Sequence, residues 1–206
     1  MDHLMPVIIL AAGGSTRMQG RDKLLETVDG TPLLRLQAGK ALALGCGPVI
    51  VALPPAPHPR YAALAGLDLQ ALPVPDAAEG MNASLRAGIA ALPDGAICAM
   101  VLLGDLPDLT VQDLAKVADA VDTDGPALIW RGATAEGAPG HPIVFRSDLF
   151  PALARLTGDS GGREVVAQVR ERVVLIPLPG SRARLDLDTP EAWADWRAGR
   201  DKGGAP

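Results

Sequence analysis

Two short stretches of the sequence combine the residue types that bind phosphates and divalent metals. Residues 13–23, GGSTRMQGRDK, hold three glycines, two arginines and a lysine directly after an aliphatic run. Glycines let backbone N–H groups approach phosphate oxygens, and Arg17 and Lys23 can neutralise a triphosphate. The spacing fits neither a dinucleotide fingerprint nor a P-loop, so the alternative is a solvated turn. Asp105, at the end of the apolar run 97–103, is either a turn residue or a magnesium ligand beside phosphates.

Two further stretches carry polar residues at places where ligands bind. Residues 79–89, EGMNASLRAGI, open a predicted helix whose N-terminus can receive an anion, although a plain N-cap explains Asn82 or Ser84 equally well. In RLDLDTPEAW, Asp186 and Asp188 alternate with leucines, which predicts that both point to one side of a short strand. They either complete a metal site or, in the case of Asp188, cap the last helix.

Composition restricts the class of protein. The 206 residues suit one domain, with 48% hydrophobic and 21% charged residues, and we expect residues 1–198 to form it and 199–206 to be a flexible tail. The net charge of -5 argues against a nucleic-acid binder. We expect neither a membrane helix nor a signal peptide. We expect the protein to be cytoplasmic. Cys46 and Cys98 lack metal-site spacing and are expected to be small buried residues of a reduced protein.

The predicted strands and helices alternate in the first half of the chain. Strands are expected over 7–12, 48–53, 67–74 and 97–103, and helices over 31–45, 60–66, 79–92 and 110–122. Thr31 and Thr110 are expected as helix caps and Gly45 as a helix stop. The second half predicts strands over 126–131, 141–145 and 173–179, and helices over 147–156, 162–172 and 189–200, the last capped by Thr189. This order predicts a Rossmann-like α/β three-layer sandwich with a mostly parallel sheet, whose ligands bind beyond the carboxyl ends of the strands.

Six ordered stretches then carry a family resemblance. They are LAAGGSTRMQGRDK, EGMNASLRAGI, GDLPDLT, GAPGHPIVF, LTGDSGGR and LDLDTPEAW. Between about Val7 and Trp196 the chain resembles nucleotidyltransferases of the molybdenum-cofactor type, most closely the molybdenum cofactor cytidylyltransferases. The resemblance implies a Mg²⁺-dependent enzyme that transfers a nucleoside monophosphate, CMP from CTP being favoured, to the phosphate of molybdopterin and releases pyrophosphate. It also implies an apo-molybdoenzyme as a further partner.

The resemblance implies a role for individual residues. Arg17, Lys23 and Asp105 are implied as catalytic. Nucleotide binding is implied for Leu10, Ala11, Ala12, Gly13, Gly14, Ser15, Arg17, Lys23, Gly80, Met81, Ser84 and Arg86. Asp105 is implied as a metal ligand together with Asp186, which is favoured, or Asp188. Acceptor binding is implied for Pro107, Gly140, His141, Pro142 and Arg163, although a lone histidine such as His141 is more often structural.

Departures from the family pattern leave alternatives open. Gly14 stands where a larger residue is usual, Gly20 is shifted by one position, and Val74 replaces a polar residue that contacts the base. These differences leave cytosine and guanine open. Alternative functions are a nucleotidyltransferase that acts on a sugar, polyol or other small phosphorylated acceptor, and a nucleotide-binding module without catalysis. The presence of both Asp105 and Asp186 argues against the second alternative.

Overall fold

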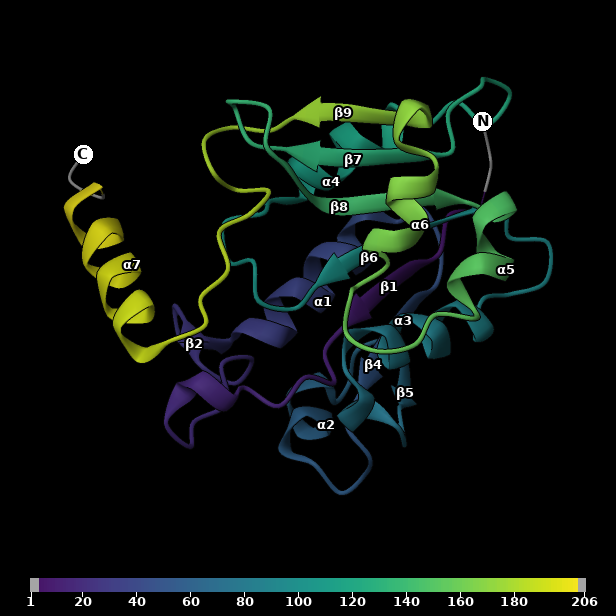
Figure 1. The fold of residues 1–206 in the computed structure, drawn as a ribbon. Helices are drawn as coiled ribbons and strands as arrows, with labels where there is room; N and C mark the ends of the chain where they lie inside the picture. The colour runs from purple at the N-terminus through teal and green to yellow at the C-terminus, as the bar shows by residue number, and fades with distance from the viewer. Residues whose placement is uncertain (1–3, 204–206) are drawn as a thin grey trace.

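The computed structural model describes residues 4–203 and, for side chains, residues 4–200. A seven-stranded sheet has the order β5-β4-β1-β6-β8-β7-β9 (Figure 1). Its strands are β1 (Val7–Leu10), β4 (Val49–Leu53), β5 (Gln70–Pro73), β6 (Cys98–Leu103), β7 (Ile129–Ala133), β8 (Pro139–Arg146) and β9 (Val173–Pro177). The helices are α1 (Leu33–Leu44), α2 (Pro59–Leu64), α3 (Met81–Ala90), α4 (Val111–Asp119), α5 (Phe150–Leu153), α6 (Arg163–Gln168) and α7 (Pro190–Gly203).

The central strand β1 shows how the three layers arise. Successive side chains of a strand point to opposite faces of the sheet. Val7 and Ile9 pack into one apolar cluster with residues of α1 and α4. Ile8 and Leu10 pack into a second cluster with residues of α3, α5 and α6. Because β1 is buried on both faces, it needs an unbroken aliphatic run, and the predicted Rossmann-like α/β sandwich is confirmed.

One strand runs against the others. Strands β5, β4, β1 and β6 pair in parallel, and β9 pairs in parallel with β7. Strand β8 pairs antiparallel with both β6 and β7, with Val101 opposite Ile143. The start of β8 therefore lies at the same edge of the sheet as the carboxyl ends of β1 and β6. Because β8 runs antiparallel to its neighbours, Gly140, His141 and Pro142 lie near this edge.

Most helix boundary signals act as predicted, with one correction. Gly45 ends α1 in the left-handed conformation with φ 68°. Thr110 forms a capping box with Asp113, and the Thr189 hydroxyl accepts a hydrogen bond from the N–H of Ala192. The prediction that Thr31 caps α1 was wrong, because residue 32 holds the N-cap position without a side-chain hydrogen bond.

Thr31 belongs instead to a two-residue hairpin. Strand β2 (Thr27–Val28) pairs antiparallel with β3 (Thr31–Pro32). The two residues between them, Asp29 and Gly30, both have positive φ, 50° and 79°. Asp-Gly is the residue pair that such a turn favours, so the sequence did indicate a hairpin here. The predicted helix start at Thr31 assigned the second strand of that hairpin to the helix instead.

The remaining boundaries shift by a few residues. The predicted helix over 147–156 is a 3₁₀ turn, η3 (Ser147–Leu149), followed by the four-residue α5, and that over 162–172 is α6 followed by η4 (Arg170–Arg172). Helix α7 continues through Gly203, so 199–203 are helical, and 204–206 lie outside the described residues. Cys98 is buried and Cys46 is half-buried. None of the helices among the described residues is long and apolar enough to cross a membrane.

Candidate active site

Residues 13–23, here called the glycine loop, leave the carboxyl end of β1. Ala11 and Ala12 are still buried, whereas Gly13 and Gly14 are exposed, so the chain reaches the surface within two residues. A Cβ atom at Gly13 would meet nothing within 4 Å, which leaves its backbone open to a ligand. Past the 3₁₀ turn η1 (Thr16–Met18), Gly20 has φ 85°, a conformation that glycine adopts without strain.

Lys23 connects this loop to two acids from distant parts of the chain. Its Nζ atom donates to Oδ2 of Asp105 at 2.5 Å and to Oδ1 of Asp188 at 2.5 Å. Burial of the ammonium group lowers the pKa of Lys23, but the charges and hydrogen bonds of Asp105 and Asp188 outweigh burial and raise the pKa overall. Lys23 is therefore a cation in the folded protein. Arg17, which is largely exposed, also pairs with Asp188.

Three carboxylates lie close together beside Lys23, which contacts two of them. Asp105, Asp186 and Asp188, here called the acidic trio, each offer one oxygen, and these three oxygens lie within 4.8 Å of one another. Oδ1 of Asp105 is buried and, among the described residues, has no hydrogen-bond partner. A buried carboxylate oxygen without a partner is costly unless a further ligand satisfies it. Carboxylate oxygens are the ligands that Mg²⁺ and Mn²⁺ prefer, so the donor set fits a hard divalent cation.

The pKa values of Asp186 and Asp188 move apart. Burial raises the pKa of Asp186, and its hydrogen bond with Asp188 and the charges of Asp188 and Asp105 raise it further. Burial also opposes ionisation of Asp188, but hydrogen bonds with Lys23 and Asp186 and the charges of Lys23 and Arg17 lower its pKa overall. The trio therefore concentrates negative charge at one point, and its members compete for the available cations.

The segment that carries Asp186 and Asp188, residues 181–188 and here called the acidic loop, is not the predicted short strand. Residues 181–184 form a turn, and 185–188 have no regular secondary structure. The loop is fixed by its contact with β8, where the N–H of His141 donates to the carbonyl of Ala183 at 2.8 Å. A Cβ at Gly140 would lie 2.1 Å from that carbonyl oxygen, so this approach requires glycine. Leu187 is buried, and its carbonyl accepts from the indole Nε1 of Trp193.

The residues at the start of α3 contact another loop rather than the acidic trio. The N–H of Met81 donates to Asp159, and the buried Asn82 amide donates to the carbonyl of Thr157 and accepts from the N–H of Gly162. Gly80 has φ 115° and faces Asp159, and Ser84 is buried. Nucleotide binding by Gly80, Met81 and Ser84 stays a prediction.

Arg86 is occupied by protein groups. Its guanidinium donates to Asp76, to Glu79 and to the carbonyl of Leu156. Hydrogen bonds with Glu79 raise the pKa of Arg86, and those with Asp76 add to this effect. The guanidinium thus links η2 (Ala77–Glu79) to the loop after α5. Its implied role in nucleotide binding stays a prediction.

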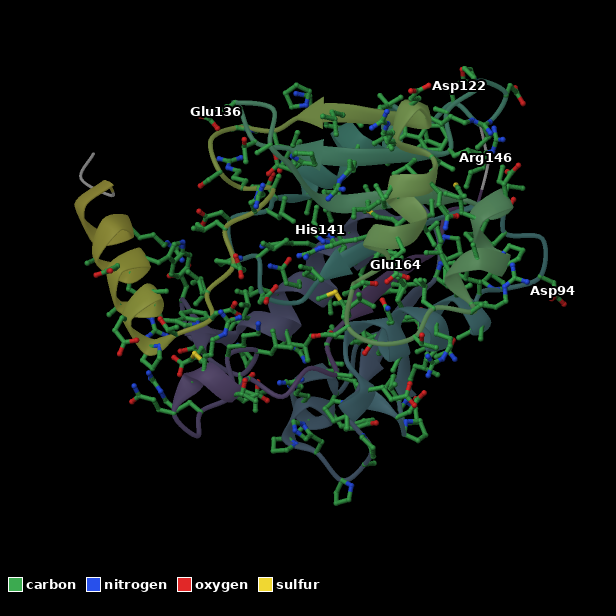
Figure 2. All side chains as sticks on the ribbon, viewed as in Figure 1. Asp94, Asp122, Glu136, His141, Arg146 and Glu164 are labelled. Carbon is green, nitrogen blue, oxygen red and sulfur yellow. The ribbon has the colours of Figure 1, made fainter. Side chains whose placement is uncertain are left out.

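The residues implied to bind an acceptor are spread over the second half of the sheet. The Pro107 carbonyl accepts from Lys40, Gly140 lies against Ala183, and Pro142 is buried in β8. Arg163 is exposed at the first residue of α6. In Figure 2, His141 lies near the middle of the molecule, with Glu164 of α6 below and to the right of it, whereas Asp94, Asp122 and Arg146 lie along the right-hand side of the view.

His141 is held in the neutral state. Its Nδ1 atom is buried and finds no partner among the described residues. Burial, to which the charge of Arg131 adds, lowers the pKa of His141 to about 4. Arg131 donates to the carbonyl of Gly140, the preceding residue. At neutral pH the imidazole is therefore uncharged, and its acceptor role stays a prediction.

One residue of the site was missed by sequence reasoning. Arg60, the second residue of α2, is 1% exposed, and its guanidinium makes a two-bond contact with Asp22 in the glycine loop. An arginine near the start of a short helix is typical of a solvated surface, so nothing local indicated its burial. The signal available was Asp22 itself, an acid inside a cationic loop directly before Lys23.

The trio of acids beside a lysine suits the binding of a divalent metal, and comparison with known proteins identifies the family. The model of the MobA-like NTP transferase domain matches residues 7–173. The chain belongs to this family.

Relatives with curated names carry different activities in those names. A probable molybdenum cofactor guanylyltransferase of Mycobacterium bovis is 32% identical over 172 residues, which are 78% of this chain and 77% of that protein. The nicotine blue oxidoreductase of Paenarthrobacter nicotinovorans is 29% identical over 197 residues, 89% of this chain and 92% of that protein. The chain spans about a third of the length of the first curated relatives it matches, a bifunctional GlmU and a phosphoenolpyruvate guanylyltransferase.

Solved structures share the whole fold. The crystal structure of Rv0371c from Mycobacterium tuberculosis superposes with a TM-score of 0.80 at 30% identity, covering 98% of this chain and 100% of that one. A second structure of Rv0371c, with a TM-score of 0.77, 28% identity and coverage of 93% and 97%, is a complex with manganese. A divalent metal is therefore present in the structure of a similar protein.

Proposed function

We propose that this protein is a Mg²⁺-dependent nucleotidyltransferase that transfers CMP from CTP to the phosphate of molybdopterin and releases pyrophosphate. The observation that carries the proposal is the acidic trio, three carboxylate oxygens within 4.8 Å of one another beside Lys23. Such an arrangement is costly unless cations balance it, and a metal with a bound triphosphate supplies both the balancing charge and a reason for the glycine loop next to it.

Asp105, Asp186 and Asp188 are proposed to hold the metal. A divalent cation bound there would supply charge neutralisation at the phosphate oxygens. The partnerless Oδ1 of Asp105 supports its assignment as a ligand. Since one oxygen of Asp186 and one of Asp188 both lie within 4.8 Å of an oxygen of Asp105, we extend the assignment to both acids.

The reaction needs no covalent enzyme intermediate. An oxygen of the acceptor's phosphate attacks the α-phosphorus of the nucleotide, a new oxygen–phosphorus bond forms, and the bond to the pyrophosphate oxygen breaks with its electron pair going to pyrophosphate. The acceptor phosphate is already an anion at neutral pH, so no general base is required. The residues act by positioning and by electrostatics, as in other phosphoryl transfers.

Lys23 and Arg17 are proposed to change partners during substrate binding. Both now neutralise acids of the trio, Lys23 at Asp105 and Asp188, and Arg17 at Asp188. With a metal held by the acids, these side chains would be free to contact the triphosphate. Arg17 is largely exposed and Lys23 has a flexible stem, so both can reach a neighbouring phosphate. There they would stabilise the negative charge that develops on the leaving pyrophosphate.

Guanylyl transfer is the second candidate for the nucleotide. It is supported by the name of the Mycobacterium bovis relative, a probable molybdenum cofactor guanylyltransferase. The first candidate is supported by the resemblance of the six motifs to cytidylyltransferases. Val74, which departs from that pattern, is buried in a small cluster with Ala12, Ala52 and Ala83 and offers the base no polar group.

The proposal is tested by pyrophosphate release from CTP, GTP, UTP and ATP. Each nucleotide is tested with molybdopterin and with a sugar phosphate, in Mg²⁺, Mn²⁺ or chelator. We expect turnover with CTP, molybdopterin and Mg²⁺, and none in chelator. In Asp105→Asn, turnover should fall by about 10³-fold or more, because the metal loses a ligand and Lys23 loses a partner.

The matched control is Asp94→Asn, since Asp94 is exposed and lies at the far end of the molecule from His141 (Figure 2). This variant should retain wild-type turnover and melting temperature. Turnover only with GTP would replace CTP by the second candidate. Near-normal turnover of Asp105→Asn would remove the metal assignment. Metal-independent oxidoreductase activity without pyrophosphate release would overturn the proposed function, a result that the similarity to nicotine blue oxidoreductase makes worth testing.

A further inference from the structure

Arg60 is the most deeply buried charged side chain near the glycine loop. It is 1% exposed and belongs to α2, which follows β4 and is separated from the loop by more than 30 residues of sequence. A buried cation is tolerated when it is paired and hydrogen-bonded. A cation at the start of a helix also faces the positive end of the helix dipole, so the stability of α2 itself does not explain an arginine there.

The guanidinium of Arg60 contacts three parts of the glycine loop and its root. Nη1 donates to the carbonyl of Ala11 at 2.6 Å, where the chain leaves β1. Nε and Nη2 donate to the two carboxylate oxygens of Asp22, each at 2.7 Å. Nη2 also lies 3.2 Å from the hydroxyl of Ser15. A planar fork with fixed donors is suited to hold such a set of acceptors in one geometry.

Asp22 and Ser15 pass this constraint to the backbone of Lys23. The N–H of Leu24 donates to Asp22 at 3.0 Å, and the Ser15 hydroxyl donates to the same carboxylate. The N–H of Lys23 donates to the hydroxyl oxygen of Ser15 at 3.2 Å. The backbone on both sides of the Lys23 side chain is therefore fixed by groups that Arg60 holds.

We infer that Arg60 is a positioning residue of the active site, which locks the glycine loop through Asp22 and Ser15 so that the Lys23 ammonium group is held where it reaches the acidic trio and, once substrate binds, the proposed triphosphate. The inference rests on the proposed function for its effect on turnover. Lys23 reaches the trio through a stem with four rotatable bonds, so a small shift of its backbone moves the ammonium group out of contact. Displacements of about 1 Å at a positioning group can lower turnover by about 10²-fold.

The experiment distinguishes the positioning of the glycine loop by Arg60 from a contribution of Arg60 to the stability of the fold. Arg60→Met alone leaves Asp22 without its partner, so the main variant is the double substitution Arg60→Met with Asp22→Leu, which replaces the pair by apolar groups of similar size. The matched control is Arg35→Met. Arg35 of α1 donates to the carbonyls of Ala63 and Ala65 and so holds the other end of α2, and in the described part of the chain it makes no hydrogen bond to the glycine loop.

The first measurement is independent of activity. Trace acetylation of lysines, read by mass spectrometry, reports how well each ammonium group is held. In the double variant we expect Lys23 to react at least about tenfold faster than in the wild type, because an ion pair with two carboxylates otherwise protects it. Lys116, which donates to the Pro177 carbonyl, serves as the internal reference and should not change. Arg35→Met should label like the wild type.

The second measurement is pyrophosphate release. In the double variant kcat should fall by about 10²-fold, whereas the melting temperature stays within a few degrees of the wild type. In the single variant Arg60→Ala, added methylguanidinium should restore part of kcat, and methylammonium at equal concentration should not. A purely structural role predicts loss of the fold and no rescue.

Unchanged labelling of Lys23 in a folded double variant would overturn the inference. Unchanged kcat in that variant would overturn it as well. If the wild type released no pyrophosphate from any nucleotide, the proposed function would fail, and the labelling of Lys23 would still decide whether Arg60 locks the loop.

Discussion

The glycine loop and the acidic loop meet at Lys23, but different interactions hold them. The glycine loop is fixed by a buried ion pair and hydrogen bonds from Arg60. The acidic loop is fixed by apolar side chains and backbone contacts, since Ala183 and Leu187 are buried and the Ala183 carbonyl pairs with His141. Hydrogen bonds define direction, whereas apolar burial defines position and leaves more angular freedom. The backbone of Lys23 is therefore held in one orientation, whereas Asp186 and Asp188 keep more freedom to change their orientation.

The two loops also share one apolar cluster. Trp193 of α7 is fully buried and packs with Met18 of the glycine loop, Leu33 of α1 and Leu187 of the acidic loop. Its indole donates to the carbonyl of Leu187 at 3.1 Å. Arg197 lies over the Trp193 ring, 4.8 Å from its centroid, and pairs with Glu26. Helix α7 thus adds an apolar connection between two loops that otherwise meet through the ion pairs of Asp188 with Arg17 and Lys23.

The largest expected effect breaks this shared cluster. Trp193→Ala should lower the free energy of unfolding by about 3–5 kcal/mol, because it leaves a cavity and an unpaired carbonyl. Trp193→Phe keeps most of the apolar contact and should cost about 1–2 kcal/mol. Urea denaturation followed by circular dichroism measures both values. A loss below about 1 kcal/mol in Trp193→Ala would show that the loops do not depend on α7.

A smaller effect concerns the β8 side of the acidic loop and depends on pH. The pKa of His141 is lowered to about 4 from an ordinary value of 6.5, mainly by burial. As pH falls from 6.5 to 4, the unfolded chain takes up a proton that the folded protein does not, so the folded state loses stability over this window. The difference of about 2.5 pKa units, at about 1.4 kcal/mol per unit, predicts a loss of about 3 kcal/mol from His141 alone.

The measurement is the free energy of unfolding of the wild type and of His141→Asn between pH 4 and pH 7. The difference between the two curves isolates the histidine from the carboxylates, which titrate in both proteins. We expect the wild-type curve to fall more steeply with decreasing pH. Parallel curves would mean that the imidazole takes up a proton equally well in the folded protein.

The smallest effect sharpens the contrast within the glycine loop. Arg17 is largely exposed, unlike Lys23, although both pair with Asp188. Arg17→Gln should change the free energy of unfolding by less than about 0.5 kcal/mol, because exposed ion pairs contribute little. If Arg17 contacts the triphosphate, KM for the nucleotide should rise by about tenfold, because the variant loses one charge-assisted hydrogen bond. Equal KM values in the variant and the wild type would restrict phosphate binding to Lys23.

The layers of the fold could be predicted because each depends on local sequence. Unbroken aliphatic runs such as 7–10 and 98–103 define the buried strands, and Gly45 and Thr110 mark helix ends. The reversed direction of β8 could not be predicted, since its residues alternate no differently from those of a parallel strand. The hairpin at Asp29 and Gly30 was predictable in principle from its residue pair.

The site was predictable where glycines and acids follow strand ends. The rule that ligands bind beyond the carboxyl ends of strands selected the stretches that hold Lys23 and Asp105, and the structure brings these two residues into contact. The acidic loop was misassigned as a strand, because alternation of leucine and aspartate also arises when a coil buries every second residue. Arg60 could not be found, because its partner lies 38 residues earlier in the chain and burial of a cation depends on that long-range pairing.

The reversed strand β8 has a consequence for how relatives of this protein can diverge. Because β8 begins at the edge where β1 and β6 end, the segment entering it, residues 134–138, borders the proposed acceptor side. Residues 134–138 lie outside the strand pairings, so a change of length there would leave the sheet and the residues of the glycine loop in place. If the acceptor binds beside the start of β8, as proposed, relatives could change their acceptor at this one hairpin tip.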